Sequence, residues 1–246
     1  MTSIESEQIQ IETPDGPMPA HLWRPVSGTG PGLVLVQEIF GVSDYIRQRA
    51  ADLAQLGYVV CAPEVYWRLD RADIDFTRDD VLDQAMGLVS QVDWPAAVAD
   101  VSLVLSHLRG MIEVDRGVGL IGFCFGGGLA FNVAAVTDPD VLVSYYGSAL
   151  GDLTHLATEV TAPSLHHFGL DDAYVTRETQ ERIRTAVTRT DARFETYAGA
   201  GHAFDNPSPA FHHAEASAAA WGVTTSFLAE HLPTTQPRLG DTVDAA

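Results

Sequence analysis

The amino-acid sequence predicts a single-domain α/β fold with a mostly parallel, doubly wound sheet and an N-terminal antiparallel hairpin. Five short apolar runs lack the alternation of half-exposed strands, which is typical of strands covered on both faces. Segments with helical spacing lie between most of these runs, and this alternation favours parallel pairing with right-handed crossovers. The 246 residues suffice for one sizeable core and show no repeat or linker, so we expect one domain.

The strands are expected in order along the chain. The hairpin consists of residues 8–13, which alternate with period two, and residues 18–24, which follow the turn sequence Pro14-Asp15-Gly16. The buried strands are expected at 32–36, 58–62, 118–121, 141–146 and 164–168. A final strand is expected at 192–197, ahead of a Gly-rich loop.

The helices are expected where apolar residues recur at helical spacing. Ser43, Asp79 and Thr176 are the expected caps or first-turn residues. The helical segments are 43–56, 79–89, 95–108, 125–135, 176–189 and about 212–231. From Pro233 the chain becomes polar, so we expect the domain to span residues 1–233 and a loose tail to occupy 234–246.

Composition restricts the partners. The chain has 33 acidic and 14 basic residues, for a formal charge of −19, which repels nucleic acid and anionic membrane surfaces. We expect a small-molecule substrate and a monomer or homodimer. Because the sequence shows no leader and no apolar run of membrane-spanning length, a cytoplasmic location is expected. Two cysteines fit a reducing compartment, and Cys61 is expected in the core of the strand 58–62.

The most informative segment is Gly-Phe-Cys-Phe-Gly at 122–126, between the apolar run 118–121 and the helix 125–135. Glycines on either side of the central residue allow a turn so tight that its side chain stands clear of the sheet. A helix N-terminus stabilises nearby negative charge, so a thiol there can act as a thiolate. The segment indicates a nucleophile at Cys124, although a small buried cysteine can also simply pack a helix against a strand.

Two further polar groups follow later strands. An acid, Asp171 or Asp172, comes after one strand, and His202 follows another through the Gly-rich loop. In a doubly wound sheet, chemistry gathers beyond the carboxyl ends of the strands. Nucleophile, acid and histidine, in this order along the chain, form the triad of α/β-hydrolases. The sequence therefore predicts that Cys124, one of the two acids and His202 act together.

Another strand ends in a carboxylate, in the segment Gln-Glu-Ile-Phe-Gly at 37–41. In α/β-hydrolases this loop supplies one of the two backbone N–H groups of the oxyanion hole. We expect that group to be the amide of Ile39, with Phe125 as the second donor. Glu38 would then lie close to Cys124, unless it is only a loop acid that faces water.

Together these motifs resemble the dienelactone hydrolase (carboxymethylenebutenolidase) family. The resemblance runs from about residue 8 to 231 and also includes Ala-Pro-Glu-Val-Tyr at 62–66, Tyr-Tyr-Gly at 145–147 and Gly-His-Ala-Phe at 201–204. It implies a single α/β-hydrolase domain, a Cys-Asp-His triad and a glutamate at Glu38 that pairs with the cysteine in the resting enzyme. The family spacing Gly-x-x-Asp-x-x-Val favours Asp172 over Asp171.

The chain departs from the family where the resemblance would place a substrate-anion clamp. Dienelactone-specific members carry an arginine and a tyrosine on the helix that aligns with 79–89, and a second arginine four residues after the histidine. Arg78 and Arg68 are the candidates for a displaced clamp. Neutral residues cannot replace a charge-assisted, oriented contact to a carboxylate. At the clamp positions the chain carries Leu82, Met86 and Asn206. The residues expected to line the substrate pocket are these three together with Phe40, Tyr146, Tyr174 and Phe204.

These observations predict a hydrolase that cleaves an ester or lactone through a thioester acyl-enzyme, without a cofactor. Glutamine amidotransferases also place a cysteine in such a turn. Their late histidine precedes a glutamate by two residues, whereas His202 is followed by Ala203 and Phe204. A non-catalytic protein that retains the fold and binds a small molecule is the remaining alternative.

Two pairs of adjacent histidines, His166-His167 and His212-His213, do not predict a metal site. Neighbours on a strand point to opposite faces, and no metal-ligand spacing recurs. We therefore expect no metal.

Overall fold

The computed structural model describes residues 4–69, 74, 78–188 and 191–234. Most of the expected C-terminal tail, from residue 235 onward, and the end of the helix expected at 176–189 lie outside the described residues.

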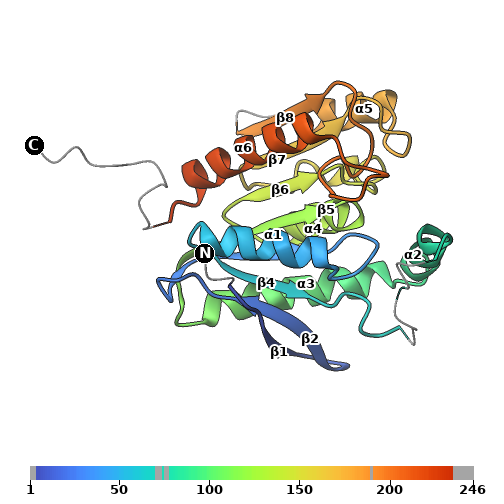
Figure 1. Ribbon diagram of the computed structural model, residues 1–246. Coiled ribbons are helices and arrows are strands. Elements are labelled where there is room, and N and C mark those ends of the chain that lie inside the picture. The colour runs from blue at the N-terminus through green and yellow to red at the C-terminus, as the bar shows by residue number, and fades with distance from the viewer. Residues whose placement is uncertain (1–3, 70–73, 75–77, 189–190, 235–246) are drawn as a thin grey trace, which may run out of the picture.

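Within the described residues, eight strands form one sheet in the order β1-β2-β4-β3-β5-β6-β7-β8 (Figure 1). β1 and β2 form the antiparallel hairpin, β2 runs antiparallel to β4, and every later neighbour is parallel. The predicted doubly wound sheet with an N-terminal hairpin is confirmed. The strands are β1 (Glu7–Thr13), β2 (Gly16–Trp23), β3 (Gly30–Val36), β4 (Val59–Pro63), β5 (Val114–Phe123), β6 (Leu142–Tyr145), β7 (Ser164–Gly169) and β8 (Ala192–Tyr197).

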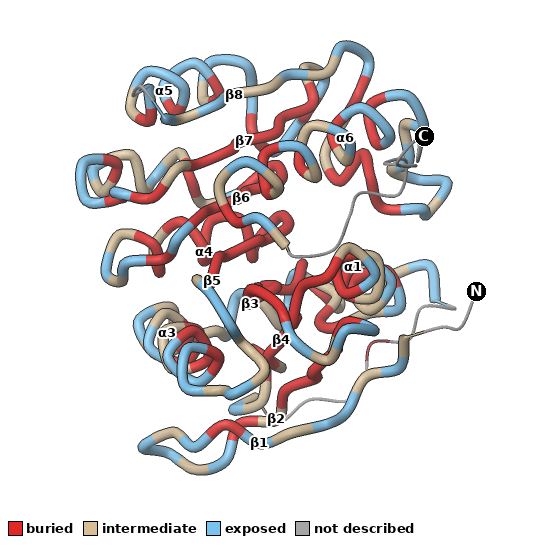
Figure 2. Tube along the Cα trace, turned by 90° about the vertical axis from the view of Figure 1, so that its left-hand side faces the viewer, coloured by how far each residue is buried: buried red, intermediate tan, exposed pale blue. Residues whose placement is uncertain are grey.

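The helices cover both faces of the sheet. Figure 2 shows α1 and α6 on one side of the buried strands and α3, α4 and α5 on the other. α2 stands apart at the edge of the fold (Figure 1) and buries only Ala85. The helices are α1 (Asp44–Gln55), α2 (Val81–Val89), α3 (Trp94–Gly110), α4 (Phe125–Val136), α5 (Arg177–Val187) and α6 (Ala214–His231).

The predicted elements are present, and their ends differ by only a few residues. The largest difference is in β5, which begins at Val114 because this residue already pairs with Gly30 of β3, ahead of a register irregularity before Val118. A short 3-10 helix at Thr154–Leu156 was not predicted, since a single turn carries no periodic signal. Among the described residues no single helix is long and apolar enough to cross a membrane; α2 and α3 pass that test only as a pair, bent by 87°.

The core explains why the inner strands lack alternation. Every residue of β3, β4, β6 and β7 is buried, because helices pack on both faces. α4 is almost wholly buried between the sheet and α3. Cys61 in β4 is fully buried, as predicted, and burial raises the pKa of its thiol to about 12. The parallel strands β3, β5, β7 and β8 all end at the same edge of the sheet, and the segments after them carry the candidate site.

Candidate active site

Cys124 lies in the turn between β5 and α4, with φ 52° and ψ −117°. A positive φ is uncommon for a residue other than glycine, and such strain gathers at functional sites. A Cβ at Gly122 would collide with the carbonyl oxygen of Gly126, and one at Gly126 would collide with that of Gln37. The two glycines are therefore required for the close backbone approach that holds the cysteine in this conformation, and the predicted tight turn is present.

Cys124, His202 and Asp172 form one hydrogen-bonded chain. The sulfur of Cys124 lies 3.0 Å from His202 Nε2, and His202 Nδ1 lies 2.7 Å from Asp172 Oδ2. The second carboxylate oxygen, Oδ1, accepts the backbone N–H groups of Tyr174 and Val175 at 2.8 and 2.9 Å. These two donors hold the carboxylate in place, so Oδ2 is presented to the imidazole.

The two candidate acids have different surroundings. Asp172 is buried, whereas Asp171 is exposed and forms an ion pair of 3.1 Å with Arg177. The structure therefore brings Asp172, and not Asp171, to His202.

The imidazole of His202 contacts two tyrosine rings, with centroid distances of 5.0 Å to Tyr146 and 5.1 Å to Tyr174. Burial alone would lower the pKa of His202, but its hydrogen bonds to Asp172 and Cys124 outweigh that effect and raise the pKa to about 10. The surroundings thus favour an imidazolium, and a cation next to sulfur stabilises a thiolate.

Glu38 lies between β3 and α1 and is only 2% exposed. Asn206 Nδ2 donates to both carboxylate oxygens, at 3.1 and 3.2 Å, and Ser43 Oγ donates to Oε1 at 3.4 Å. Burial raises the pKa of Glu38 to about 7, although the bonds from Asn206 oppose the shift. The resting cysteine–glutamate pair implied by the family resemblance is not present in this structure, because the sulfur of Cys124 bonds to His202 while the Asn206 amide holds the carboxylate.

The expected oxyanion-hole donors, Ile39 and Phe125, line the same cavity as Cys124. Phe125 is the first residue of α4, so its N–H has no acceptor within the helix. In the described part of the chain, neither amide donates to a protein acceptor. Both therefore have a donor available for an oxygen bound beside the sulfur.

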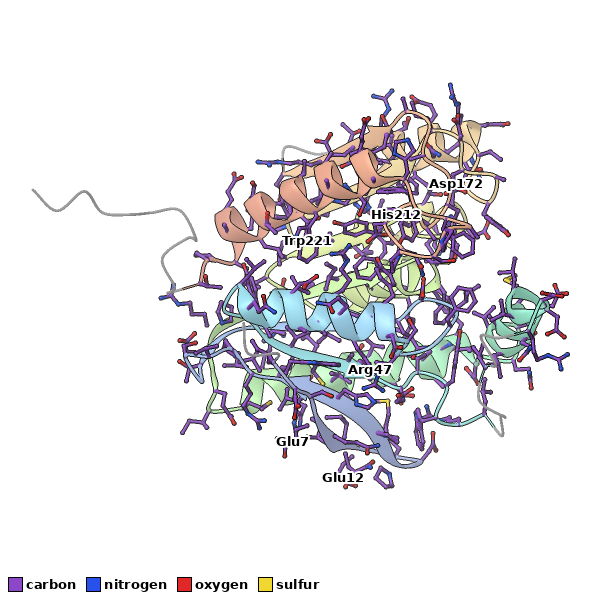
Figure 3. The ribbon with its side chains drawn as sticks, in the orientation of Figure 1. Glu7, Glu12, Arg47, Asp172, His212 and Trp221 are labelled. Carbon is purple, nitrogen blue, oxygen red and sulfur yellow. The ribbon has the colours of Figure 1, made fainter. Side chains whose placement is uncertain are left out.

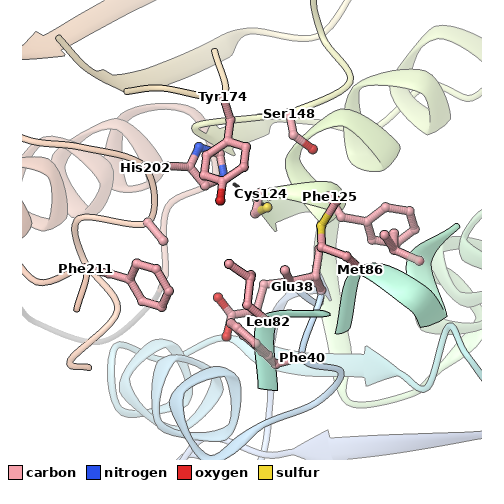
Figure 4. Close-up of a pocket in the computed structure, with 13 residues that line it drawn as sticks. Glu38, Phe40, Leu82, Met86, Cys124, Phe125, Ser148, Tyr174, His202 and Phe211 are labelled. Atoms are coloured by element: carbon pink, nitrogen blue, oxygen red, sulfur yellow. Dashed lines mark hydrogen bonds between the residues drawn. The ribbon is translucent and has the colours of Figure 1, made fainter. Parts of the chain in front are cut away.

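A cavity of about 120 Å³ opens at the cysteine, and Figure 4 shows Cys124, His202 and Glu38 around it. Of the predicted pocket residues, Phe40, Leu82, Met86 and Tyr174 line this cavity. Sequence reasoning missed four lining residues: Val89, Ser148, Ala203 and Phe211. Val89 could have been found, because it follows Leu82 and Met86 on one helix face. Ser148 and Phe211 lie in irregular segments, where no periodicity shows which way a side chain points.

Three predicted pocket residues have other roles. Tyr146 and Phe204 are fully buried, and their ring centroids lie 5.4 Å apart, so the expectation that they line the pocket is wrong. Asn206 holds Glu38 and faces a second cavity of about 810 Å³, which adjoins the first at Glu38, Phe40, Leu82 and Phe211.

No displaced anion clamp is seen among the described residues that line the cavity at Cys124, since none is an arginine or a lysine. Arg78 binds Asp80 at 2.7 Å on the surface, and Arg68 binds Asp15 and Asp100. In the second cavity, Arg47 lies beside Glu64 and contacts His21. The described cations near the site are thus already matched with protein groups.

One histidine of each adjacent pair has structural partners. His167 bonds to Tyr197 and Thr224 in the core, and His213 accepts the Ala216 N–H as the N-cap of α6. The described residues contain no group of three or more histidine, cysteine or carboxylate side chains that could hold a metal ion.

A doubly wound sheet with a cysteine in the strained strand-to-helix turn, and an acid and a histidine after later strands, places the chain among the α/β hydrolases. More narrowly, the chain belongs to the dienelactone hydrolase family, whose sequence model matches residues 18–232. It is 32% identical over 227 residues to a carboxymethylenebutenolidase of Pseudomonas putida, covering 91% of this chain and 96% of that protein.

Two further comparisons agree with this assignment. Carboxymethylenebutenolidase 1 of Cupriavidus pinatubonensis is 31% identical over 202 residues, covering 81% of this chain and 86% of that protein. The crystal structure of a putative dienelactone hydrolase from Klebsiella pneumoniae superposes with a TM-score of 0.78 at 29% identity, covering 93% of this chain and all of that one. The chain is a hydrolase of lactone or ester substrates.

Proposed function

We propose that this protein hydrolyses a carboxylic ester or lactone through a Cys124-His202-Asp172 triad and a thioester acyl-enzyme. The supporting observation is the hydrogen-bonded chain from sulfur to imidazole to carboxylate, with distances of 3.0 and 2.7 Å. A nucleophile and a base within hydrogen-bond reach, with the base oriented by a third group, is the arrangement that covalent catalysis requires.

The first half of the reaction forms the thioester. His202 takes the thiol proton, the sulfur of Cys124 bonds to the carbonyl carbon, and the carbonyl π electrons move to oxygen. The amides of Ile39 and Phe125 donate to that oxyanion. When the carbonyl re-forms, the carbon–oxygen bond to the leaving group breaks, and His202 returns its proton to the departing alkoxide.

The second half hydrolyses the thioester. His202, now neutral, removes a proton from water as the water oxygen attacks the acyl carbon, and the same amides donate to the new oxyanion. When this intermediate collapses, the carbon–sulfur bond breaks, His202 returns the proton to the sulfur of Cys124, and the acid product leaves. Asp172 stays ionised throughout, fixes the tautomer of His202 and stabilises its cationic form.

Glu38 adjusts the charge around the sulfur and imidazole. Its carboxyl titrates near neutral pH because it is buried, and it interacts electrostatically with His202. An ionised Glu38 adds a second negative charge to the cavity and opposes thiolate formation, whereas the neutral acid does not. The Asn206 amide keeps this carboxyl at its place in the cavity wall.

The substrate we propose is uncharged near its reacting carbonyl. The lining of the catalytic cavity is mostly apolar, with Leu82 and Met86 contributed by α2, and none of the described residues that line it is an arginine or a lysine that could bind a substrate carboxylate. The formal charge of −19 also disfavours anions at long range.

The test is to trap the acyl-enzyme. The purified protein is mixed with a neutral aryl ester, quenched in acid and digested, and the peptide that carries the acyl mass is identified. We expect the acyl group on Cys124 and no turnover by Cys124→Ala. Acylation of another residue, or full hydrolysis by Cys124→Ala, contradicts the proposal. A protein that binds the ester without turnover would instead support the non-catalytic alternative.

A further inference from the structure

We propose that Asp205 is a positioning residue that holds the histidine loop, so that the imidazole of His202 stays on the sulfur of Cys124. This inference rests on the proposed triad and adds to it a buried carboxylate that takes no part in the reaction steps above. Asp205 is only 2% exposed and does not line either of the two cavities described.

The loop after β8 bends sharply between His202 and Asp205. Ala203 has a φ of 55°, which is costly for a residue with a Cβ, and its carbonyl oxygen accepts the Asn206 N–H at 2.9 Å. The carbonyl oxygen of Phe204 accepts the His213 N–H at 2.8 Å. A strained backbone of this kind persists only where surrounding contacts over-determine it, and Asp205 supplies such contacts.

The carboxylate of Asp205 joins the loop to two other parts of the fold. Tyr45, from α1, donates its hydroxyl to Oδ2, and Tyr146, from the segment after β6, donates its hydroxyl to Oδ1. Arg49 lies 3.6 Å from Oδ2 and balances the charge. Its guanidinium rests 4.7 Å from the ring of Trp221, which α6 directs toward α1 (Figure 3).

Tyr146 is the link from Asp205 to the imidazole. Its ring packs against His202 at a centroid distance of 5.0 Å, while its hydroxyl is held by Asp205. Its own φ is 37°, and its N–H donates to the carbonyl oxygen of His167 at 2.7 Å, so the residue is fixed at both ends. The ring therefore forms a wall that limits how far the imidazole can turn away from the sulfur.

The same loop also carries Asn206, which holds Glu38. Asp205 thus helps to position two groups near the sulfur: His202, which lies on the same loop, and Glu38, which Asn206 holds. A carboxylate suits this role because it accepts two hydroxyl donors on separate oxygens while pairing with a cation, whereas an amide offers one oxygen only.

The test compares Tyr146→Phe with Tyr58→Phe. Each variant removes one buried tyrosine hydroxyl that donates a single hydrogen bond; that of Tyr58 goes to the carbonyl oxygen of Leu232 at 3.0 Å, away from the site. For each protein, kcat and KM for a neutral aryl ester are measured, together with the rate of iodoacetamide alkylation of Cys124 as a function of pH. Alkylation reports the thiolate in the absence of substrate.

We expect Tyr146→Phe to lower kcat about tenfold with KM unchanged within about twofold, because misplacement of the base slows the chemical step rather than binding. The pH midpoint of alkylation should rise by about half a unit, because a displaced imidazolium stabilises the thiolate less well. Tyr58→Phe should lose comparable thermal stability but keep the wild-type kcat and alkylation profile.

A second pair of measurements tests the network as a unit. Asp205→Asn should lower kcat at least as much as Tyr146→Phe does. The double variant, which carries both substitutions, should have a kcat no lower than that of Asp205→Asn alone, because residues in one network do not act additively. Should Asp205→Asn not fold, Tyr45→Phe takes its place, with a smaller loss expected because Tyr45 does not touch the imidazole.

The inference is overturned if Tyr146→Phe matches Tyr58→Phe in both kcat and alkylation midpoint. That outcome leaves the triad intact, provided Cys124→Ala is inactive. Full activity of Cys124→Ala instead refutes the triad itself, so the two failures are distinguishable.

Discussion

Replacement of Asp172 by asparagine should cost at least about a thousandfold in kcat. The reason lies in the two backbone donors behind this side chain. Oδ1 accepts the N–H groups of Tyr174 and Val175, so an amide at this position must keep its oxygen there and turn its NH₂ group toward His202 Nδ1. A donor facing Nδ1 makes that nitrogen an acceptor and moves the imidazole proton to Nε2.

That tautomer cannot accept the thiol proton, because Nε2 is the nitrogen that faces the sulfur of Cys124. In serine triads the same exchange costs about 10⁴ in kcat, and a factor of a thousand corresponds to about 4 kcal/mol of transition-state stabilisation. The matched control is Asp171→Asn. Asp171 is exposed, and among the described residues its carboxylate pairs with Arg177 and not with His202; surface pairs contribute at most about 1 kcal/mol, so its loss should change kcat by less than about fivefold.

The assay is steady-state hydrolysis of a neutral aryl ester by the wild type and both variants, with circular dichroism to show that each has folded. If Asp172→Asn keeps more than about a tenth of the wild-type kcat, or loses less than Asp171→Asn, the orientation argument is refuted and another acid must orient His202.

The remaining predictions concern the thiols, the buried glutamate and the substrate. Iodoacetamide should alkylate Cys124 with parallel loss of activity and leave Cys61 unmodified, because burial raises the Cys61 pKa to about 12; peptide mapping checks this, and inactivation that follows Cys61 would contradict it. Burial raises the pKa of Glu38 from 4.5 to about 7, so the folded protein binds the proton more tightly than the unfolded chain, and its unfolding free energy should fall by about 3 kcal/mol as pH rises through this range. The unfolding free energy of Glu38→Gln, measured in urea at pH 5 and pH 8, should differ less between the two pH values than that of the wild type. An equal difference in both proteins would show that Glu38 is not the source of the pH dependence. A neutral aryl ester should exceed its carboxylate-bearing counterpart by roughly ten- to a hundredfold in kcat/KM; a preference for the anion that weakens with salt would reveal an arginine that reaches the cavity.

The parts of the site that could be predicted from the sequence are those determined by local chain geometry. The glycines at 122 and 126 predict the turn at Cys124. Because parallel strands end at one edge of the sheet, the position of His202 after a later strand predicts that it lies near this turn. Which of two adjacent acids faces the histidine could not be derived from strand ends alone, and only the family spacing favoured Asp172. In the structure, the Tyr174 and Val175 amides hold its carboxylate.

Contacts between distant segments could not be predicted. Asn206 and Glu38 are 168 positions apart, and Asp205 and Tyr45 are 160 apart, so neither pair leaves a periodic signal. Tyr146, in the motif Tyr-Tyr-Gly at 145–147, was expected in the pocket, but it is buried with a left-handed backbone and packs its ring against the imidazole.

The position of α2 separates the shape of the substrate cavity from the stability of the fold, two properties that usually constrain each other. This helix contributes Leu82, Met86 and Val89 to the cavity wall, yet it buries only Ala85. Most substitutions on it therefore act on a surface that meets the substrate and not on the packing that folds the sheet or holds Cys124 and His202. Divergence of substrate range can proceed through α2 by single steps, each with little loss of folding stability, and a laboratory library confined to the cavity-facing positions of α2 should retain a high fraction of folded, chemically competent enzymes.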